Sequence, residues 1–120
     1  MDSQVPLKEL KDRMRRFKTR MDEKNPEWEL AAFFGKINLY YFTGTMQDST
    51  LIIPRDGEPT LWVRKSYERG LQESSFERIN KMDSFRDAAK GYRKLPKAVY
   101  IETEIVPVAL LNRFLKHFPI

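Results

Sequence analysis

The sequence predicts an α/β domain with a mixed sheet of five to six strands that contains one antiparallel hairpin and is flanked by helices. Three observations support this class: amphipathic helical patterns near both ends, short apolar runs between them, and an Asp56-Gly57 turn joining two of those runs. Asp-Gly between apolar runs is typical of a tight β-hairpin. Strands that alternate with helices indicate a sheet covered by helices. The hairpin argues against a purely parallel, doubly wound sheet.

The first predicted helix has one apolar stripe and a basic opposite face. Its apolar residues recur at spacings of three and four, as on one side of a helix: Leu7, Leu10, Met14, Phe17 and Met21. Pro6 suits a first helical turn. Asn25-Pro26 disfavours helical geometry, so we expect the helix to end near Lys24.

The apolar runs that follow predict the strands. They cover residues 28–34, 50–54, 60–64, 78–81 and 98–102. The run from Trp28 to Phe34 is apolar almost throughout, which is typical of a strand buried on both faces. Ile37 to Phe42 predicts a short helical turn or a return loop. We expect its aromatic residues, Tyr40, Tyr41 and Phe42, to serve core and interface packing.

Three further helices are expected. Residues 66–74 predict a short helix that is broken or capped near Gly70. A second begins at residues 83–87, where Asp and Ser are good caps, and runs to about Tyr92, with Gly91 near its end. Residues 107–117 predict a final helix whose inward side chains are Leu110, Leu111, Phe114 and Leu115.

Composition indicates one soluble globular domain over residues 1–120. Hydrophobic residues make up 41% and charged residues 32% of the chain, and no apolar run approaches the roughly 20 residues that a membrane helix needs. The start of the chain lacks the pattern of a secretory signal, and there are no cysteines. We therefore expect a cytoplasmic protein that does not bind a membrane.

Positive charge is concentrated in the first helix. The net charge is +5, and residues 8–24 hold eight basic and four acidic side chains. Such a helix could bind a nucleic acid, a membrane surface or an acidic partner, but a solvated outer face is the favoured interpretation. The sequence has no signature of a common nucleic-acid-binding module.

The residues alone predict no catalytic centre and no metal site. His117 is the one histidine, no Gly-x-Ser-x-Gly elbow is present, and no glycine-rich phosphate loop occurs. Asp56 suits a turn, whereas Asp83 and Asp87 suit a helix start. Only Asp48 has no evident structural role, and a single carboxylate does not make a two-metal site.

Two motifs resemble a known family. "INLYYFTGT" at residues 37–45 and "LIIPRDGEPTL" at residues 51–61 are similar to the N-terminal domain of the creatinase, prolidase and Xaa-Pro aminopeptidase family. The order of the later elements agrees, so the resemblance covers nearly the whole chain. One departure is that Asn38 follows Ile37, whereas the family pattern has this asparagine first.

The resemblance implies a fold of the creatinase/prolidase N-terminal type and a non-catalytic role within a metal-dependent Xaa-Pro peptidase. In that family a separate pita-bread domain, which we expect this chain to lack, binds two Mn, Co or Zn ions and hydrolyses the bond before proline. The domain here would shape the substrate entrance and support homodimerisation. By resemblance, Thr45, Met46, Gln47 and Asp48 form the substrate-entrance loop.

Two other functions remain open at this point. The chain could be a stand-alone protein-interaction module of the same fold, since fold does not fix function. It could also be a basic nucleic-acid-binding domain that uses the first helix, which the absence of a recognition motif disfavours. Taken alone, the chain is predicted to be inactive as an enzyme.

Overall fold

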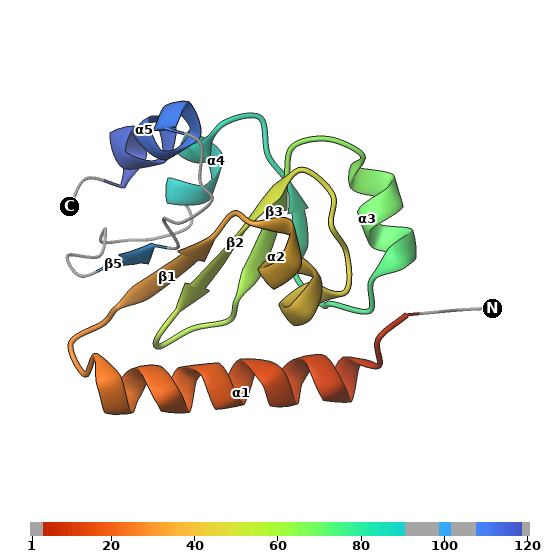
Figure 1. The fold of residues 1–120 in the computed structure, drawn as a ribbon. Coiled ribbons are helices and arrows are strands. Elements are labelled where there is room, and N and C mark those ends of the chain that lie inside the picture. The colour runs from red at the N-terminus through yellow and green to blue at the C-terminus, as the bar shows by residue number, and fades with distance from the viewer. Residues whose placement is uncertain (1–3, 91–98, 102–107, 119–120) are drawn as a thin grey trace.

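A computed structural model describes residues 4–90, 99–101 and 108–118. Along the chain its elements are α1 (Leu7–Lys24), β1 (Leu30–Phe33), α2 (Lys36–Thr43), β2 (Ser49–Pro54), β3 (Thr60–Val63), α3 (Tyr67–Glu73), β4 (Ile79–Lys81), α4 (Phe85–Ala89), β5 (Val99–Ile101) and α5 (Val108–His117). Figure 1 shows a central sheet with helices around it.

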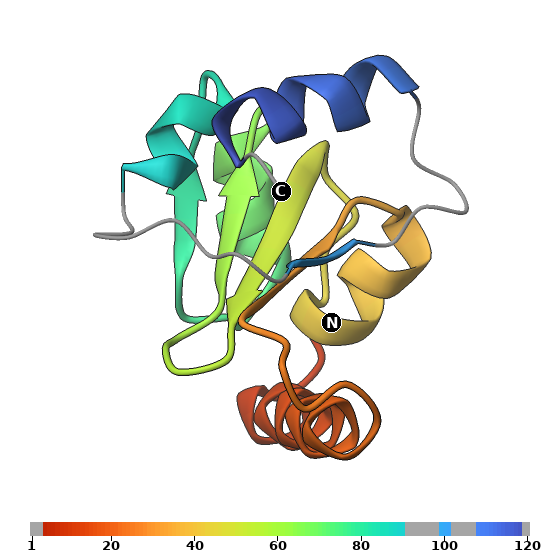
Figure 2. The ribbon, with the colours of Figure 1, turned by 90° about the vertical axis from the view of Figure 1, so that its left-hand side faces the viewer.

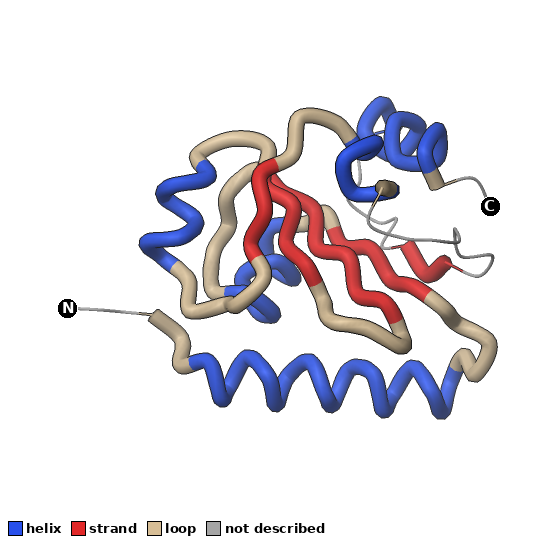
Figure 3. Tube along the Cα trace, turned by 180° about the vertical axis from the view of Figure 1, so that it is seen from behind, coloured by secondary structure: helices blue, strands red, loops and turns tan. Residues whose placement is uncertain are grey.

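The sheet is mixed, as the sequence predicts. Its strands lie in the order β4-β3-β2-β1-β5, which gives five strands within the described residues (Figure 3). β2 pairs antiparallel with both β1 and β3. At the two edges of the sheet, β4 pairs in parallel with β3, and β5 pairs in parallel with β1. The β2–β3 hairpin is closed by the turn that contains Asp56-Gly57, and Leu51 lies opposite Leu61. The predicted fold class is therefore confirmed.

Helices cover both faces of the sheet and form two cores. In Figure 2, α1 lies below the sheet and α5 above it. Because successive side chains of a strand point to opposite faces, β1 supplies both cores. Ala31 and Phe33 face α1 and α2, whereas Leu30 and Ala32 face α4 and α5. All four residues of β1 are buried, as the apolar run predicts.

The first helix ends where the sequence predicts. Its N-terminal Pro6 provides no side-chain cap, and the Asn25 amide donates to the Met21 carbonyl at its C-terminal end. The helix is held by burial of its apolar stripe, in which Leu10, Met14 and Met21 are buried. Since a helix without a side-chain cap depends mainly on tertiary packing, this stripe is its principal source of stability.

Two predicted details are wrong. Gly70 lies buried inside α3 and does not break or cap it. The helix α4 ends at Ala89, earlier than expected, although Lys90 keeps helical dihedral angles. Gly91 and Tyr92, where the sequence places its end, lie outside the described residues.

The last helix follows its predicted pattern where the side chains are described. Phe114 is fully buried and Leu115 packs at the edge of the core. The Leu110 and Leu111 side chains lie outside the described part of the chain. Among the helices of residues 4–90 and 108–118, none is long and apolar enough to cross a membrane.

Candidate functional site

The segment after α2 turns sharply at a glycine. Gly44 has a φ of 81°, in the left-handed region that side chains disfavour, and its amide donates to the Tyr40 carbonyl over 2.8 Å. The Thr43 hydroxyl donates to the Leu39 carbonyl over 2.6 Å and closes the last turn of α2. This cap aims the next four residues, the predicted entrance loop, towards α3.

Glu73, at the end of α3, anchors that loop. Its Oε1 accepts a hydrogen bond from Thr45 Oγ1 at 2.8 Å and another from Gln47 Nε2 at 3.0 Å. These bonds, that of Thr45 first, lower the pKa of the Glu73 carboxyl. Arg69, one turn earlier in α3, contacts the other carboxylate oxygen at 3.2 Å. The loop is thus tied to α3 by an ionised acceptor, which makes its hydrogen bonds stronger.

A second contact joins the loop to the segment after α3. The Ser74 hydroxyl donates to the Thr43 carbonyl and accepts a hydrogen bond from the Phe76 amide. Ser74 is buried, as are Thr43 and Thr45. The Thr43 and Ser74 hydroxyls therefore satisfy buried backbone groups, whereas the Thr45 hydroxyl donates to the Glu73 carboxylate.

Asp48 has a structural role, contrary to the sequence interpretation. Its carbonyl accepts the Arg64 amide over 2.8 Å, which extends the pairing of β2 with β3 by one residue. Its carboxylate lies 3.5 Å from an Arg64 guanidinium nitrogen. This second contact is long, and the Asp48 side chain is 44% exposed, so the carboxylate remains accessible.

Met46 projects from the anchored loop. Its side chain is 50% exposed, whereas the neighbouring Thr45 is buried and Gln47 is partly buried. The structure therefore brings the four predicted site residues together but gives them different roles. Thr45 and Gln47 hold the loop, and Met46 and Asp48 present an apolar and an acidic group to solvent.

The outer face of α2 adds exposed apolar surface on the same connection. Ile37 is 80% exposed, and Tyr40 and Tyr41, one turn later, are each more than 40% exposed. Phe42, by contrast, is buried. The Arg13 guanidinium lies 4.6 Å from the centre of the Tyr41 ring and donates to the Tyr41 carbonyl. The three aromatics are thus divided between core and surface.

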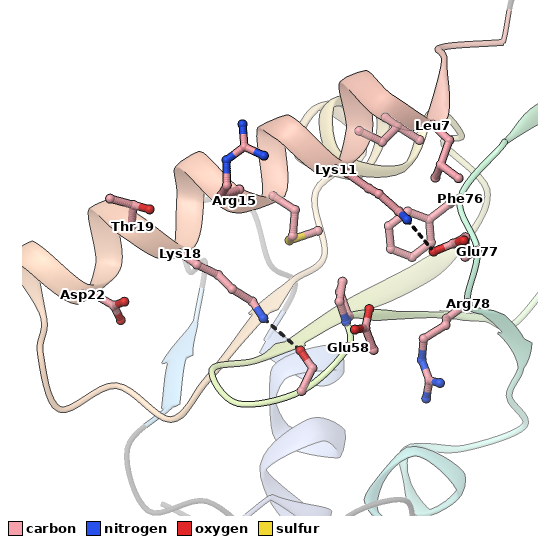
Figure 4. Close-up of a pocket in the computed structure, with 14 residues that line it drawn as sticks. Leu7, Lys11, Arg15, Lys18, Thr19, Asp22, Glu58, Phe76, Glu77 and Arg78 are labelled. Atoms are coloured by element: carbon pink, nitrogen blue, oxygen red, sulfur yellow. Dashed lines mark hydrogen bonds and ion pairs between the residues drawn. The ribbon is translucent and has the colours of Figure 1, made fainter.

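A groove of about 390 Å³ lies between α1 and the β2–β3 hairpin (Figure 4). Leu10 and Met14 contribute apolar surface, and Lys11 forms an ion pair with Glu77 at 3.4 Å. Lys18 Nζ donates to the Gly57 carbonyl over 2.8 Å, and burial lowers the pKa of its ammonium group. Sequence reasoning missed this groove, because it depends on the distance between two segments that no local pattern specifies.

Most basic residues of α1 already have acidic partners. Five of them pair with carboxylates within 4 Å: Lys8, Lys11, Arg13, Arg15 and Arg16. The Lys18 ammonium bonds backbone carbonyls instead. This arrangement agrees with a solvated outer face and leaves little free charge for phosphates.

The acidic residues considered as metal ligands are used by local structure. Asp87 accepts the Asp83 and Ser84 amides, and these bonds, that of Asp83 first, lower the pKa of its carboxyl. Together with the Ser84 hydroxyl they form the capping box of α4. Within the described residues, no three His, Cys, Asp or Glu side chains gather in a way that could hold a metal ion.

Comparison with known proteins identifies the family. The model of the Creatinase/Prolidase N-terminal domain matches residues 13–119. A proline dipeptidase structure from Streptococcus agalactiae 2603V is 18% identical, with a TM-score of 0.74 over 89% of this chain and 87% of that chain. A search of curated proteins found no match.

Two longer structures share the fold. Prolidase from Pyrococcus furiosus is 24% identical, with a TM-score of 0.64 over 83% of this chain and 29% of that chain. Prolidase from Pyrococcus horikoshii OT3 is 20% identical, with a TM-score of 0.74 over 91% of this chain and 30% of that chain. The present chain thus spans less than a third of either Pyrococcus prolidase. The chain belongs to the Creatinase/Prolidase N-terminal domain family.

Proposed function

We propose that this chain is the N-terminal domain of a metal-dependent Xaa-Pro peptidase of the proline dipeptidase or aminopeptidase P type. The observation that carries the proposal is the family match over residues 13–119, together with structural neighbours described as prolidases, proline dipeptidases and an Xaa-Pro aminopeptidase. In this proposal hydrolysis would take place in a separate catalytic domain, where two divalent metal ions would supply the Lewis acid for the peptide carbonyl. The domain described here shapes the approach to that centre.

The anchored loop is the part that meets the substrate. Met46 offers a flexible apolar contact for side chains of varied shape. The Asp48 carboxylate, half-exposed and only loosely held by Arg64, suits the free amino group of a short peptide. Glu73 holds the loop backbone in one place, so the two groups keep their spacing.

The exposed face of α2 supports assembly. Ile37, Tyr40 and Tyr41 form a stripe of exposed apolar surface, and Arg13 covers part of the Tyr41 ring. Stripes of this kind are typical of interaction surfaces. We place the contact with a second copy, or with the catalytic domain, on this helix. A stand-alone interaction module would use the same stripe, and it is the second candidate function.

The loop assignment is tested in the protein that carries the catalytic domain. The double variant Met46→Ser/Asp48→Asn leaves the Glu73 anchor intact and should raise the KM for an Xaa-Pro dipeptide about tenfold, with a smaller change in kcat. Leu71→Ser is the matched control, because Leu71 is an equally exposed apolar residue on α3. Unchanged kinetic constants in the double variant would rule out a substrate role for the loop.

A further inference from the structure

A second pocket lies on the opposite face of the sheet from α1. It has a volume of about 340 Å³ and is formed by the residue after β3, the turn into α4 and the last turns of α5. Figure 1 shows α4 and α5 side by side at this edge of the molecule. Four permanent cations line it, Arg64, Arg86, Arg113 and Lys116, against one carboxylate, Asp83.

Within the described residues, these cations have few close acidic partners, although Arg86 interacts electrostatically with the neighbouring Asp87. In the described part of the chain, the Arg86, Arg113 and Lys116 side chains form no hydrogen bond and no ion pair within 4 Å. Arg64 has only the long contact of 3.5 Å to Asp48. Four like charges around one cavity repel one another, and the cost of that repulsion is offset when an anion binds between them.

The pairing differs sharply from that of α1. There, basic residues outnumber acidic ones as well, yet Arg13 and Arg15 contact carboxylates at 3.0 and 2.9 Å. The α5 macrodipole favours a cation such as Lys116 in its last turn. It does not account for Arg64 or Arg86, which come from two other segments and point to the same cavity.

The walls of the pocket suit a small oxyanion. Phe85, which is buried, lines it and lowers the local dielectric constant, which strengthens charge interactions. The Ser84 hydroxyl accepts the Arg86 amide over 3.2 Å and keeps its own proton available for a ligand. The backbone amides at the start of α4 are used by the capping box, so recognition depends on side chains. Guanidinium groups bind carboxylate and phosphate oxygens in a bidentate manner.

We propose that the pocket between Arg64, Arg86, Arg113 and Lys116 binds the oxyanion of a small ligand, a carboxylate or a phosphate group. The site adjoins the entrance loop through the contact between Arg64 and Asp48, but the proposal does not rest on the peptidase role. Its ligand would be held by the guanidinium groups of two helices and one strand end, with the Ser84 hydroxyl as an additional donor.

The experiment is an NMR titration of the ¹⁵N-labelled 120-residue chain at constant ionic strength. Inorganic phosphate and acetate are titrated separately against chloride, while the arginine side-chain and backbone amide signals are followed. The test variant is Arg113→Gln/Lys116→Gln, in which two exposed residues change and the buried core does not. The control is Arg20→Gln/Lys24→Gln, which removes the same charge from α1.

We expect saturable shifts at the pocket residues, an affinity at least tenfold weaker in the test variant, and a change of less than twofold in the control. Saturation by both anions indicates a carboxylate or general oxyanion site, and saturation by phosphate alone indicates a phosphorylated ligand. Shifts that stay linear with both anions would overturn the proposal. Equal weakening in the two variants would do so too, because it would show non-specific attraction.

Discussion

On one face of the sheet most basic residues of α1 are paired with carboxylates, whereas the described residues show no ion pair within 4 Å for Arg86, Arg113 or Lys116 on the other face. The two cores beneath are similar in kind. Phe17 packs edge-on against Trp28, Phe33 and Phe42 on the α1 face. Phe114 packs against Phe34, Phe85 and Phe118 on the other.

The difference teaches that a count of charges along the sequence does not locate a binding site. The α1 segment has the greater number of basic residues, and its i,i+4 and i,i+3 spacings let carboxylates neutralise them within the same helix. The pocket near α5 gathers fewer cations from three separate segments, and among the described residues that line it Asp83 is the one carboxylate. Free charge, not total charge, is what a ligand can use.

The largest expected effect is a difference in stability between alanine variants in the two cores. Phe114 is fully buried and stacks on Phe118 with ring centres 4.6 Å apart. Phe114→Ala should therefore lower the free energy of unfolding by about 4 kcal/mol. Phe17 is only partly buried, so Phe17→Ala should cost about 2 kcal/mol. Urea unfolding measures both, and a larger loss for Phe17→Ala would contradict the inference that burial of the side chain decides the cost.

The variant Glu73→Ala tests how much the anchor of the entrance loop contributes to the free energy of unfolding. Two hydrogen bonds to an ionised acceptor are strong, but the side chain is 37% exposed, so Glu73→Ala should cost about 1.5 kcal/mol at pH 7. Because folding lowers its pKa, the stabilisation is complete above the unfolded value, near 4.3, and is lost as the pH falls through the lower folded value. Denaturation at several pH values measures this.

The control for the loop anchor is Glu68→Ala, an exposed residue of the same helix. It should leave the free energy of unfolding nearly unchanged at every pH. If the difference between the wild type and Glu73→Ala persisted at pH 2, the contribution of Glu73 would not come from its ionised form.

A smaller effect on stability is expected from the N-terminal cap of α4, which α1 lacks. The helix α4 has five residues and a complete capping box, whereas α1 has no side-chain cap. Ser84→Ala should cost about 1 kcal/mol, since the short helix cannot compensate for the lost acceptor. Thermal unfolding provides the measurement. Ser84→Thr, which keeps the hydroxyl, should retain most of the stability, and an equal loss in both variants would argue against the cap.

The smallest effect is predicted for the paired charges of α1. Glu9 pairs with Arg13 at 3.0 Å and with Arg16 at 3.6 Å, both partly exposed. Glu9→Gln should cost about 0.5 kcal/mol at low salt and nothing measurable near 1 M salt. A loss that does not depend on salt would show that the helix relies on Glu9 for something other than its charge.

Local signals account for the parts of the fold that could be predicted. The 3–4 spacing of apolar residues and the Asn25-Pro26 pair gave both ends of α1, and Asp56-Gly57 gave the hairpin. Gly70 was misjudged because its low helix propensity is outweighed by the tertiary contacts that bury it within α3. A tertiary contact of this kind leaves no trace in the local pattern.

The candidate site was predictable only in part, for the same reason. The family motif located residues 45–48, but the anchor Glu73 lies 28 residues after Thr45 and no spacing rule connects them. The role of Asp48 depends on Arg64, its neighbour across the hairpin. The pocket near α5 joins three distant segments, so its four cations look unrelated in the sequence.

The most direct test of the central proposal is the mass and activity of the native polypeptide, isolated from its source cell with an antibody against this domain. We predict a band at about three times the 14.3 kDa of this chain, in line with its 30% share of a Pyrococcus prolidase, and hydrolysis of an Xaa-Pro dipeptide after manganese is added. A single band at 14.3 kDa without that activity would contradict the peptidase role.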